Sequence, residues 1–150
     1  MGEPGKYIKK LRENIVAAGI DLQTEYIPGG AHGVSRGGEI AVRPELSDAE
    51  TFAVLAHEFS HELLHRGDRR QETTKTIRET EAEAVAFVVS KTVGLETGTA
   101  SSDYIKLYNG SRETLQESLK HIRRCAAEIL DGLLQEEPSN AKPRTKQDVG

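Results

Sequence analysis

The sequence is poor in cysteine and has no long apolar runs. Cys125 is the single cysteine among 150 residues. One cysteine cannot form an internal disulfide, which fits a protein of a reducing compartment, and we expect a cytoplasmic one. No apolar run approaches the roughly 18–20 residues that a membrane-spanning helix needs, so we expect no contact with a membrane. The first residues lack an apolar stretch after their charges, so we also expect no secretory signal.

A basic surplus is also missing. The chain has 20 Lys and Arg against 24 Asp and Glu, a formal charge of −4. Proteins that coat nucleic acid usually carry a basic footprint, so we expect no direct nucleic-acid binding. With 36% hydrophobic and 29% charged residues, the composition is that of an ordinary globular protein. The length fits one domain, because single domains cluster at roughly 100–150 residues.

The first part of the chain combines one helix with extended segments. Apolar residues recur at helical spacing over residues 6–18, which predicts a helix that ends near Gly19. Residues 21–27 alternate loosely and predict a short strand. The glycine-rich segment 29–38 predicts a hairpin or loop, and residues 39–43 predict a half-buried strand.

The rest of the chain has the pattern of helices. Ser47 and Glu50 form a capping box, which predicts that a long helix begins at Ser47 and ends near Gly67. A polar linker is expected next. A second, largely buried helix, a short helix and a last amphipathic helix then follow at 76–92, 101–107 and 111–134, respectively.

A metal-binding pattern lies in the first long helix, where residues 57–65 read His-Glu-Phe-Ser-His-Glu-Leu-Leu-His. His57 and His61 are four residues apart, so they lie on one face of a helix, one turn apart. Two imidazoles placed in this way can bind one Zn²⁺ ion. Glu58 lies beside them, where a carboxylate can deprotonate a water that the metal activates. The pattern is that of a metallopeptidase, with His57 and His61 as ligands and Glu58 as the catalytic residue.

The same pattern occurs a second time, because residues 61–65 repeat it one turn later. We favour the first register because His57 and His61 follow an apolar stretch in the middle of the helix. His65 lies next to the cationic Arg66 at the fraying end. In the first register, His65 is expected to support the site or to interact with the helix dipole.

A catalytic zinc ion takes three protein ligands and leaves a fourth position open. The candidates for the third ligand are the carboxylates of Glu79, Glu81 and Glu83 on the next helix. At about 100° per residue, Glu79 and Glu83 share one face, and Glu81 lies nearly opposite. Spacing alone does not choose between Glu81 and the Glu79/Glu83 pair.

Two segments carry a resemblance to a known family. The first is the histidine motif within residues 55–65, and the second is the run Glu81-Ala82-Glu83-Ala84-Val85-Ala86-Phe87-Val88 in the next helix. Together they resemble the ImmA/IrrE family of zinc metallopeptidases. They look closest to the zincin-like domain of ArdC-like antirestriction proteins, to which the segment 72–105 is also similar. The resemblance covers roughly residues 6–133.

The resemblance implies particular roles for these residues. The family's third metal ligand is the first Glu of its Glu-x-Glu-Ala-x-x-Phe segment, which falls on Glu81. Four residues later the family usually has Asn or Asp, which supports a zinc-bound histidine, but this sequence has Val85 there. The resemblance also implies a zincin-like α+β fold and hydrolysis of a peptide bond in a protein substrate, such as a repressor or another regulator.

We therefore predict a zincin-like α+β domain over residues 1–135 and a disordered polar tail over residues 136–150. A small sheet of two to three strands packs on the active-site helix, and a helical part follows. The predicted activity is that of a zinc metalloendopeptidase, and its protein or peptide substrate is expected to lie along the strand at 38–43 as an added strand. The alternative is a zinc-binding regulatory or antirestriction module without proteolytic activity.

Overall fold

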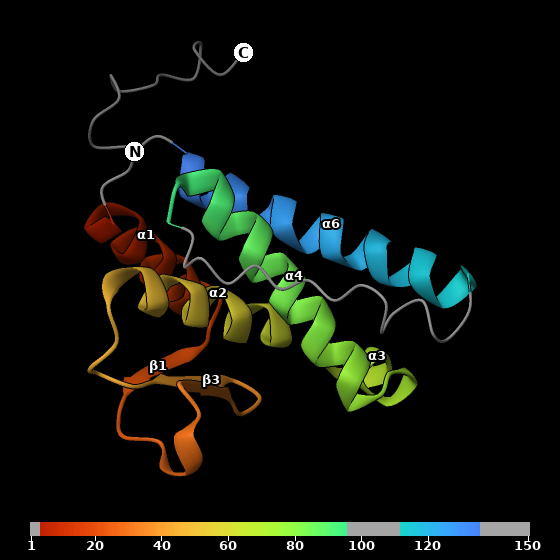
Figure 1. Cartoon of the computed structure of the whole chain (residues 1–150), viewed down its shortest axis with the longest axis horizontal. Coiled ribbons are helices and arrows are strands. Elements are labelled where there is room, and N and C mark those ends of the chain that lie inside the picture. The colour runs from red at the N-terminus through yellow and green to blue at the C-terminus, as the bar shows by residue number, and fades with distance from the viewer. Residues whose placement is uncertain (1–3, 96–111, 136–150) are drawn as a thin grey trace.

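The structure, a computed structural model, describes residues 4–95 and 112–135 (Figure 1). The predicted helix at 101–107 and the predicted tail lie outside these residues. The described elements are α1 (Pro4–Ala17), β1 (Asp21–Thr24), the 3-10 turn η1 (Pro28–Gly30), β2 (Gly33–Ser35), β3 (Glu39–Val42), α2 (Asp48–Leu64), α3 (Gly67–Glu72), α4 (Lys75–Val93) and α6 (Arg112–Leu134). The predicted α+β class with a small sheet is confirmed.

The sheet has three strands in the order β1-β3-β2. β1 runs parallel to β3, with Leu22 opposite Ile40, and β2 runs antiparallel to β3, with Val34 opposite Ala41. β3 is thus the central strand, and both of its edges are already paired. The expectation that a substrate pairs with the strand at 38–43 is therefore wrong, because a central strand has no free backbone edge to offer.

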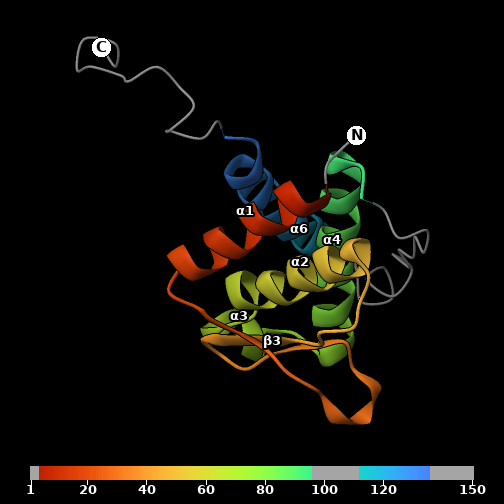
Figure 2. The same ribbon diagram turned by 90° about the vertical axis from the view of Figure 1, so that its left-hand side faces the viewer.

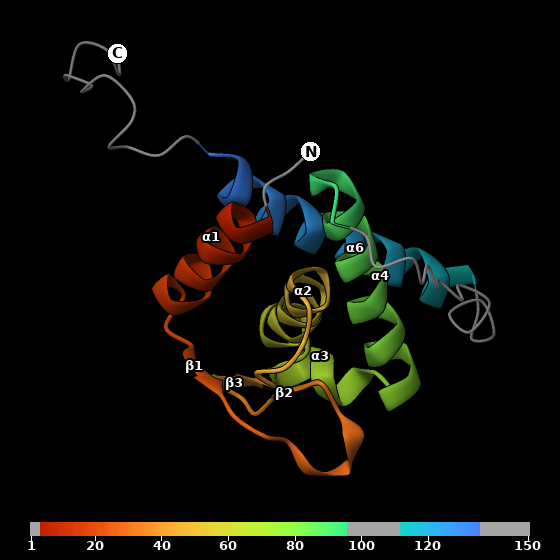
Figure 3. The same ribbon diagram turned by 60° about the vertical axis from the view of Figure 1, so that its left-hand side comes forward.

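Helix α2 lies in the middle of the molecule. Figure 3 shows it nearly end on, with the sheet below it, α1 on one side and α4 and α6 on the other. Figure 2 shows the same order from another side, with the sheet below α2 and the helices α1 and α6 above it. The contacts of α2 with α4, α1, β2 and β3 agree with this arrangement. A residue on α2 can therefore face the sheet, the core or α4, depending on its position around the helix.

The core forms where the apolar stripes of the helices meet. Leu11 and Ile15 of α1, Phe52 and Leu55 of α2, and Val85 of α4 are fully buried. The spacing of these residues is that of helix faces turned inward, as the sequence predicts. Burying large apolar side chains stabilises the fold by about 1.5–3 kcal/mol each, so these stripes fix how the helices are rotated.

The helix boundaries follow local signals. The Ser47 hydroxyl at the start of α2 accepts a hydrogen bond from the Glu50 amide, and the Glu50 carboxylate accepts one from the Ser47 amide. These two bonds complete the predicted capping box. Gly94 ends α4 in the left-handed conformation at φ 82°. The polar linker after α2 is not confirmed, because α3 forms there. None of the residues of α3 is buried, so it lacks the apolar periodicity that predicts a helix.

Cys125 is a buried free thiol on α6. Burial raises its pKa to about 12, so the thiol is protonated and unreactive at neutral pH. Among the described residues, none of the helices is both long enough and apolar enough to cross a membrane.

Candidate metal centre

The candidate site is built on the face of α2 that is turned towards α4. His57 and His61 lie one turn apart on this face, with ring centroids 4.9 Å apart and ring planes at 76°. Both rings are largely covered, with exposed side-chain fractions of 17% and 14%. The helix therefore holds two imidazoles side by side in a sheltered position, as their spacing predicts.

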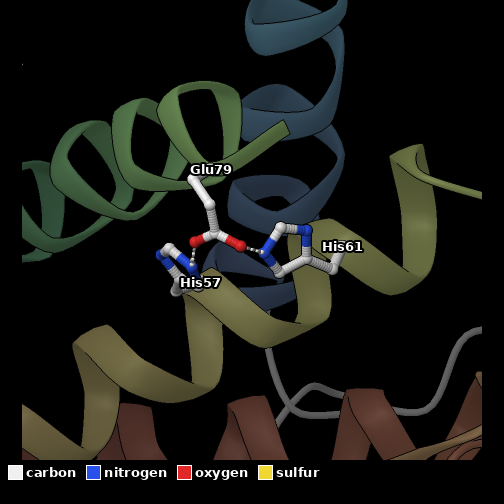
Figure 4. A group of neighbouring side chains, drawn as sticks. All are labelled: His57, His61 and Glu79. Atoms are coloured by element: carbon white, nitrogen blue, oxygen red, sulfur yellow. Dashed lines mark hydrogen bonds and ion pairs between the residues drawn. The ribbon is translucent and has the colours of Figure 1, made fainter. Parts of the chain in front are cut away.

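Glu79 of α4 joins the two histidines (Figure 4). One carboxylate oxygen, Oε1, lies 3.1 Å from His57 Nε2, and the other, Oε2, lies 3.1 Å from His61 Nε2. The three residues each offer a ligand atom, and these atoms lie within 4.8 Å of one another. Burial alone would raise the pKa of Glu79, but its bonds to His57 and His61 hold it well below the ordinary value.

Glu83 lies one turn after Glu79 and contacts the other side of the first histidine. Its Oε1 is 3.2 Å from His57 Nδ1. Burial would lower the pKa of His57, but Glu79 and Glu83 outweigh it and raise that pKa to about 10. Without a metal, two carboxylates thus surround the imidazole of His57 and favour its protonated, positively charged form.

Glu58 lies next to His57 on α2 and is 8% exposed. Burial raises the pKa of Glu58 above its ordinary value, although His57 and His61 oppose the shift. The carboxylate is on the side of α2 that carries β2. A Cβ atom placed on Gly33 of that strand would lie 3.3 Å from Glu58 Cγ. The close strand and the burial together keep Glu58 a stronger base than an exposed carboxylate.

Glu81 points away from Glu79, into the interior of the molecule, and is fully buried. Its Oε1 lies 2.8 Å from His65 Nε2, and its Oε2 accepts hydrogen bonds from Ser118 Oγ at 2.7 Å and from the Arg69 guanidinium. Burial would raise the pKa of Glu81, but these three partners hold it below the ordinary value. The structure does not bring Glu81 to His57 and His61.

His65 links this buried cluster to the site. Its Nδ1 lies 2.8 Å from His61 Nδ1, and its Nε2 is the atom that contacts Glu81. If His61 Nε2 is kept free for a metal, His61 Nδ1 must carry the proton and donate it to His65 Nδ1. His65 then carries its own proton on Nε2 and donates it to Glu81. The chain His61–His65–Glu81 therefore fixes the tautomer and the ring orientation of His61.

The glutamate of the second register binds the turn between β2 and β3 instead of the histidines. This glutamate, Glu62, is buried and accepts hydrogen bonds from the amides of Gly37 at 3.0 Å and Gly38 at 2.8 Å, and from the Ser35 hydroxyl. These bonds tie the turn between β2 and β3 to α2. A carboxylate with three such donors is not available as a base, so the geometry favours the first register.

Two cavities lie on either side of Glu58 and Gly33, which line both. One, of about 750 Å³, extends past His57 along the first half of α2. The other, of about 900 Å³, extends past His61 towards α3 and the start of α4. Because they share Gly33 and Glu58, we call the two cavities together the cleft; Gly33 belongs to β2, an edge strand of the described sheet.

The fold and the site define an α+β domain in which two largely covered histidines meet a half-exposed glutamate. A family model, the IrrE N-terminal-like domain of a peptidase family, matches residues 14–120, and the chain belongs to that family. The resemblance to the ImmA/IrrE family is thereby confirmed. The finer likeness to ArdC-like proteins stays a prediction. Neither the curated proteins nor the solved structures contain a match.

Sequence reasoning assigned no role to several residues that the structure places around the site. Glu62 carries a signal only as the glutamate of the second register, and the two glycines that it binds belong to no motif. Arg69 and Ser118 hold Glu81 from α3 and α6, and contacts between elements so far apart in the chain leave no local pattern. Glu81 itself did carry a signal. It shares an apolar stripe with Val85 and Val89, four and eight residues later, and such a stripe faces the core.

Proposed function

We propose that this chain is a zinc-dependent metallopeptidase that hydrolyses peptide bonds in a protein substrate, and that His57, His61 and Glu79 hold the zinc. One observation carries the proposal: both oxygens of Glu79 lie 3.1 Å from the Nε2 atoms of the two histidines. The ligand atoms of the three residues lie within 4.8 Å of one another, and two histidines with one glutamate are a donor set that a catalytic zinc ion takes.

If the third ligand is Glu79 instead of Glu81, the presence of Val85 where the resemblance implies a supporting Asn or Asp is also explained. The residue four positions after Glu79 is Glu83, and its carboxylate contacts His57 Nδ1. A carboxylate that accepts from the outer nitrogen of a metal-bound histidine orients the ring and raises its basicity. The supporting residue is thus present two positions earlier than the resemblance implies, and Val85 is free to pack in the core.

A bound zinc ion would act as a Lewis acid that polarises the peptide carbonyl and makes a water molecule more acidic. Glu58 accepts a proton from the attacking water and later delivers it to the leaving amine, so one water is consumed for each peptide bond broken. The raised pKa of Glu58 suits both steps, because the group must be ionised to take the proton and able to give it up.

The substrate would pair with the outer edge of β2, which pairs with no strand among the described residues. In the β2–β3 ladder, the backbone amide of Arg43 donates to the His32 carbonyl, and the backbone amide of Arg36 donates to the Glu39 carbonyl. Because backbone groups alternate in direction along a strand, those of Gly33 and Ser35 point the other way, to the outer edge. A peptide added there lies along the cleft beside Glu58.

The buried thiol of Cys125 is consistent with a reducing compartment, so we place this activity in the cytoplasm.

Replacing Gly33 by alanine tests the role of β2. The new Cβ would lie 2.4 Å from Val54 Cγ1 and 3.3 Å from Glu58 Cγ, so the strand must move away from α2. We expect hydrolysis to fall about 10- to 100-fold, because a shift of the order of 1 Å misaligns the substrate. Steady-state cleavage assays measure this loss. Gly5→Ala is the control, since its Cβ would meet no atom within 4 Å; an equal loss in both variants contradicts the proposal.

Glu58→Gln tests whether the zinc site is catalytic. Glutamine has the same shape but cannot accept the proton, so we expect zinc to be retained and hydrolysis of denatured casein and of a broad peptide panel to fall at least about 100-fold. Metal analysis and cleavage assays on the same samples measure both properties. The regulatory alternative predicts instead that wild type and variant both retain zinc and are equally inert.

A further inference from the structure

The two halves of the cleft differ in charge. Among the residues that the structure describes, no lysine or arginine lines the cavity beside His57. Small and apolar side chains such as Ala53, Val54 and Ala86 line it, together with the carboxylates of Glu50, Glu58 and Glu83. Five cations line the cavity beside His61: Arg36, Arg66, Arg70, Lys75 and Arg78. An acidic chain therefore concentrates positive charge on one side of its own candidate site.

Two of the five cations are neutralised within the molecule. Arg36 contacts Glu25 at 2.8 Å and Glu39 at 3.4 Å. Arg66 lies 3.7 Å from Glu62. These pairs hold the β2–β3 turn and the end of α2, so the two arginines have little charge left to offer a ligand.

The other three cations are not neutralised by any residue that the structure describes. Arg78 donates to the carbonyl oxygens of Arg70 at 2.8 Å and Thr73 at 2.6 Å, both neutral groups. Neither Arg70 nor Lys75 forms an ion pair within residues 4–95 and 112–135. Glu79, the nearest carboxylate along α4, is committed to the two histidines. This cavity therefore has a net positive charge that an anionic ligand would complement.

The direction of β2 sets which part of a substrate meets these cations. β2 runs from the small-residue cavity, at His32, to the cationic cavity, at Arg36. A peptide that pairs antiparallel to β2 runs the other way. Its residues before the scissile bond lie in the cationic cavity, and its residues after that bond lie in the small-residue cavity.

We propose that the substrate has acidic residues on the N-terminal side of the bond that is cleaved and a small or apolar residue after it, with Arg70, Lys75 and Arg78 as the recognising groups. This inference rests on the proposed function for the position of the bond. The recognition itself depends on the cleft, and it can be measured as binding without any cleavage.

Binding of three labelled peptides to the zinc-loaded Glu58→Gln protein tests the inference. The first peptide has glutamates in its N-terminal half, the second has glutamines there, and the third has the glutamates in its C-terminal half. We expect the first to bind about three- to tenfold more tightly than either of the others, and we expect the difference to shrink as salt is added. Fluorescence anisotropy measures these ratios.

A pair of double variants locates the effect. Arg70→Ala with Lys75→Ala should remove most of the preference for glutamate over glutamine. Arg123→Ala with Arg124→Ala removes the same charge from exposed positions of α6 that line neither cavity. This control variant should keep the preference for glutamate. Equal binding of the first two peptides, tighter binding of the third, or equal loss in both double variants would overturn the inference.

Cleavage separates this inference from the proposed function. A wild-type chain that binds the acidic peptide selectively but hydrolyses no peptide contradicts the proposed function and leaves the recognition site standing. A chain that hydrolyses peptides without regard to acidic residues before the bond contradicts the recognition site alone.

Discussion

Replacing Glu79 by alanine is expected to weaken zinc binding by more than about 100-fold and to remove peptide hydrolysis with it. Losing a residue that merely supports a ligand already costs about 10- to 100-fold in metal affinity, and Glu79 supplies a ligand atom itself. In the structure both of its oxygens face the histidine pair, and among the described residues it is the carboxylate that groups with both histidines as a possible metal site. Competition with a chromogenic chelator measures the affinity.

Two further variants sharpen this test. Glu72→Ala removes an exposed carboxylate from α3 that lies outside the His57, His61 and Glu79 group, and should leave the affinity for zinc unchanged. Glu83→Gln removes only the charge beside His57 Nδ1, and should cost about tenfold. If Glu79→Ala keeps its zinc while Glu81→Gln loses it, the third ligand is Glu81, as the resemblance implies.

Replacing Glu81 by alanine is expected to destabilise the fold by about 3–5 kcal/mol, with or without zinc. Glu81 is fully buried, and its removal leaves the guanidinium of Arg69 and the imidazole of His65 without their partner. Breaking a buried charge pair by deleting one member is costly because the other charge stays buried. Urea unfolding of the zinc-free protein measures the free energy of unfolding.

The control for this prediction is Glu79→Ala, since the side chain of Glu79 is 50% exposed. In zinc-free protein it should cost less free energy of unfolding than Glu81→Ala does, because solvent screens the interactions of a half-exposed carboxylate. The two glutamates are thus expected to separate, with Glu79 required for the metal and Glu81 for the fold. Equal destabilisation by both variants would contradict this division.

Much of the site could be predicted because its signals are local. A capping box, four-residue spacing and an apolar stripe place His57, Glu58 and His61 on α2 without any knowledge of the fold. The rotation of α4 is different, because it depends on which side chains the core accepts. Spacing shows that Glu79 and Glu83 share a face, but the packing of α4 against α2 and α6 turns that face to the histidines.

The sheet shows the same limit. The alternation of residues 39–43 predicts a strand, and β3 is there. Its neighbours are set by pairing with β1, in parallel, and with β2. Pairing between strands is not encoded in the pattern of either strand alone. The edge strands of the described sheet are therefore β1 and β2, and the edge beside Glu58 belongs to the short β2, within a segment whose glycines predict only a hairpin or loop.

The central claim, zinc-dependent peptide hydrolysis, is tested most directly by following hydrolysis of denatured casein as zinc is removed and restored. We predict that a chelator abolishes hydrolysis, and that zinc restores it in proportion to the metal bound, up to one equivalent per chain. Hydrolysis that persists in the metal-free protein, or a chain with one equivalent of zinc that hydrolyses nothing, would contradict the account.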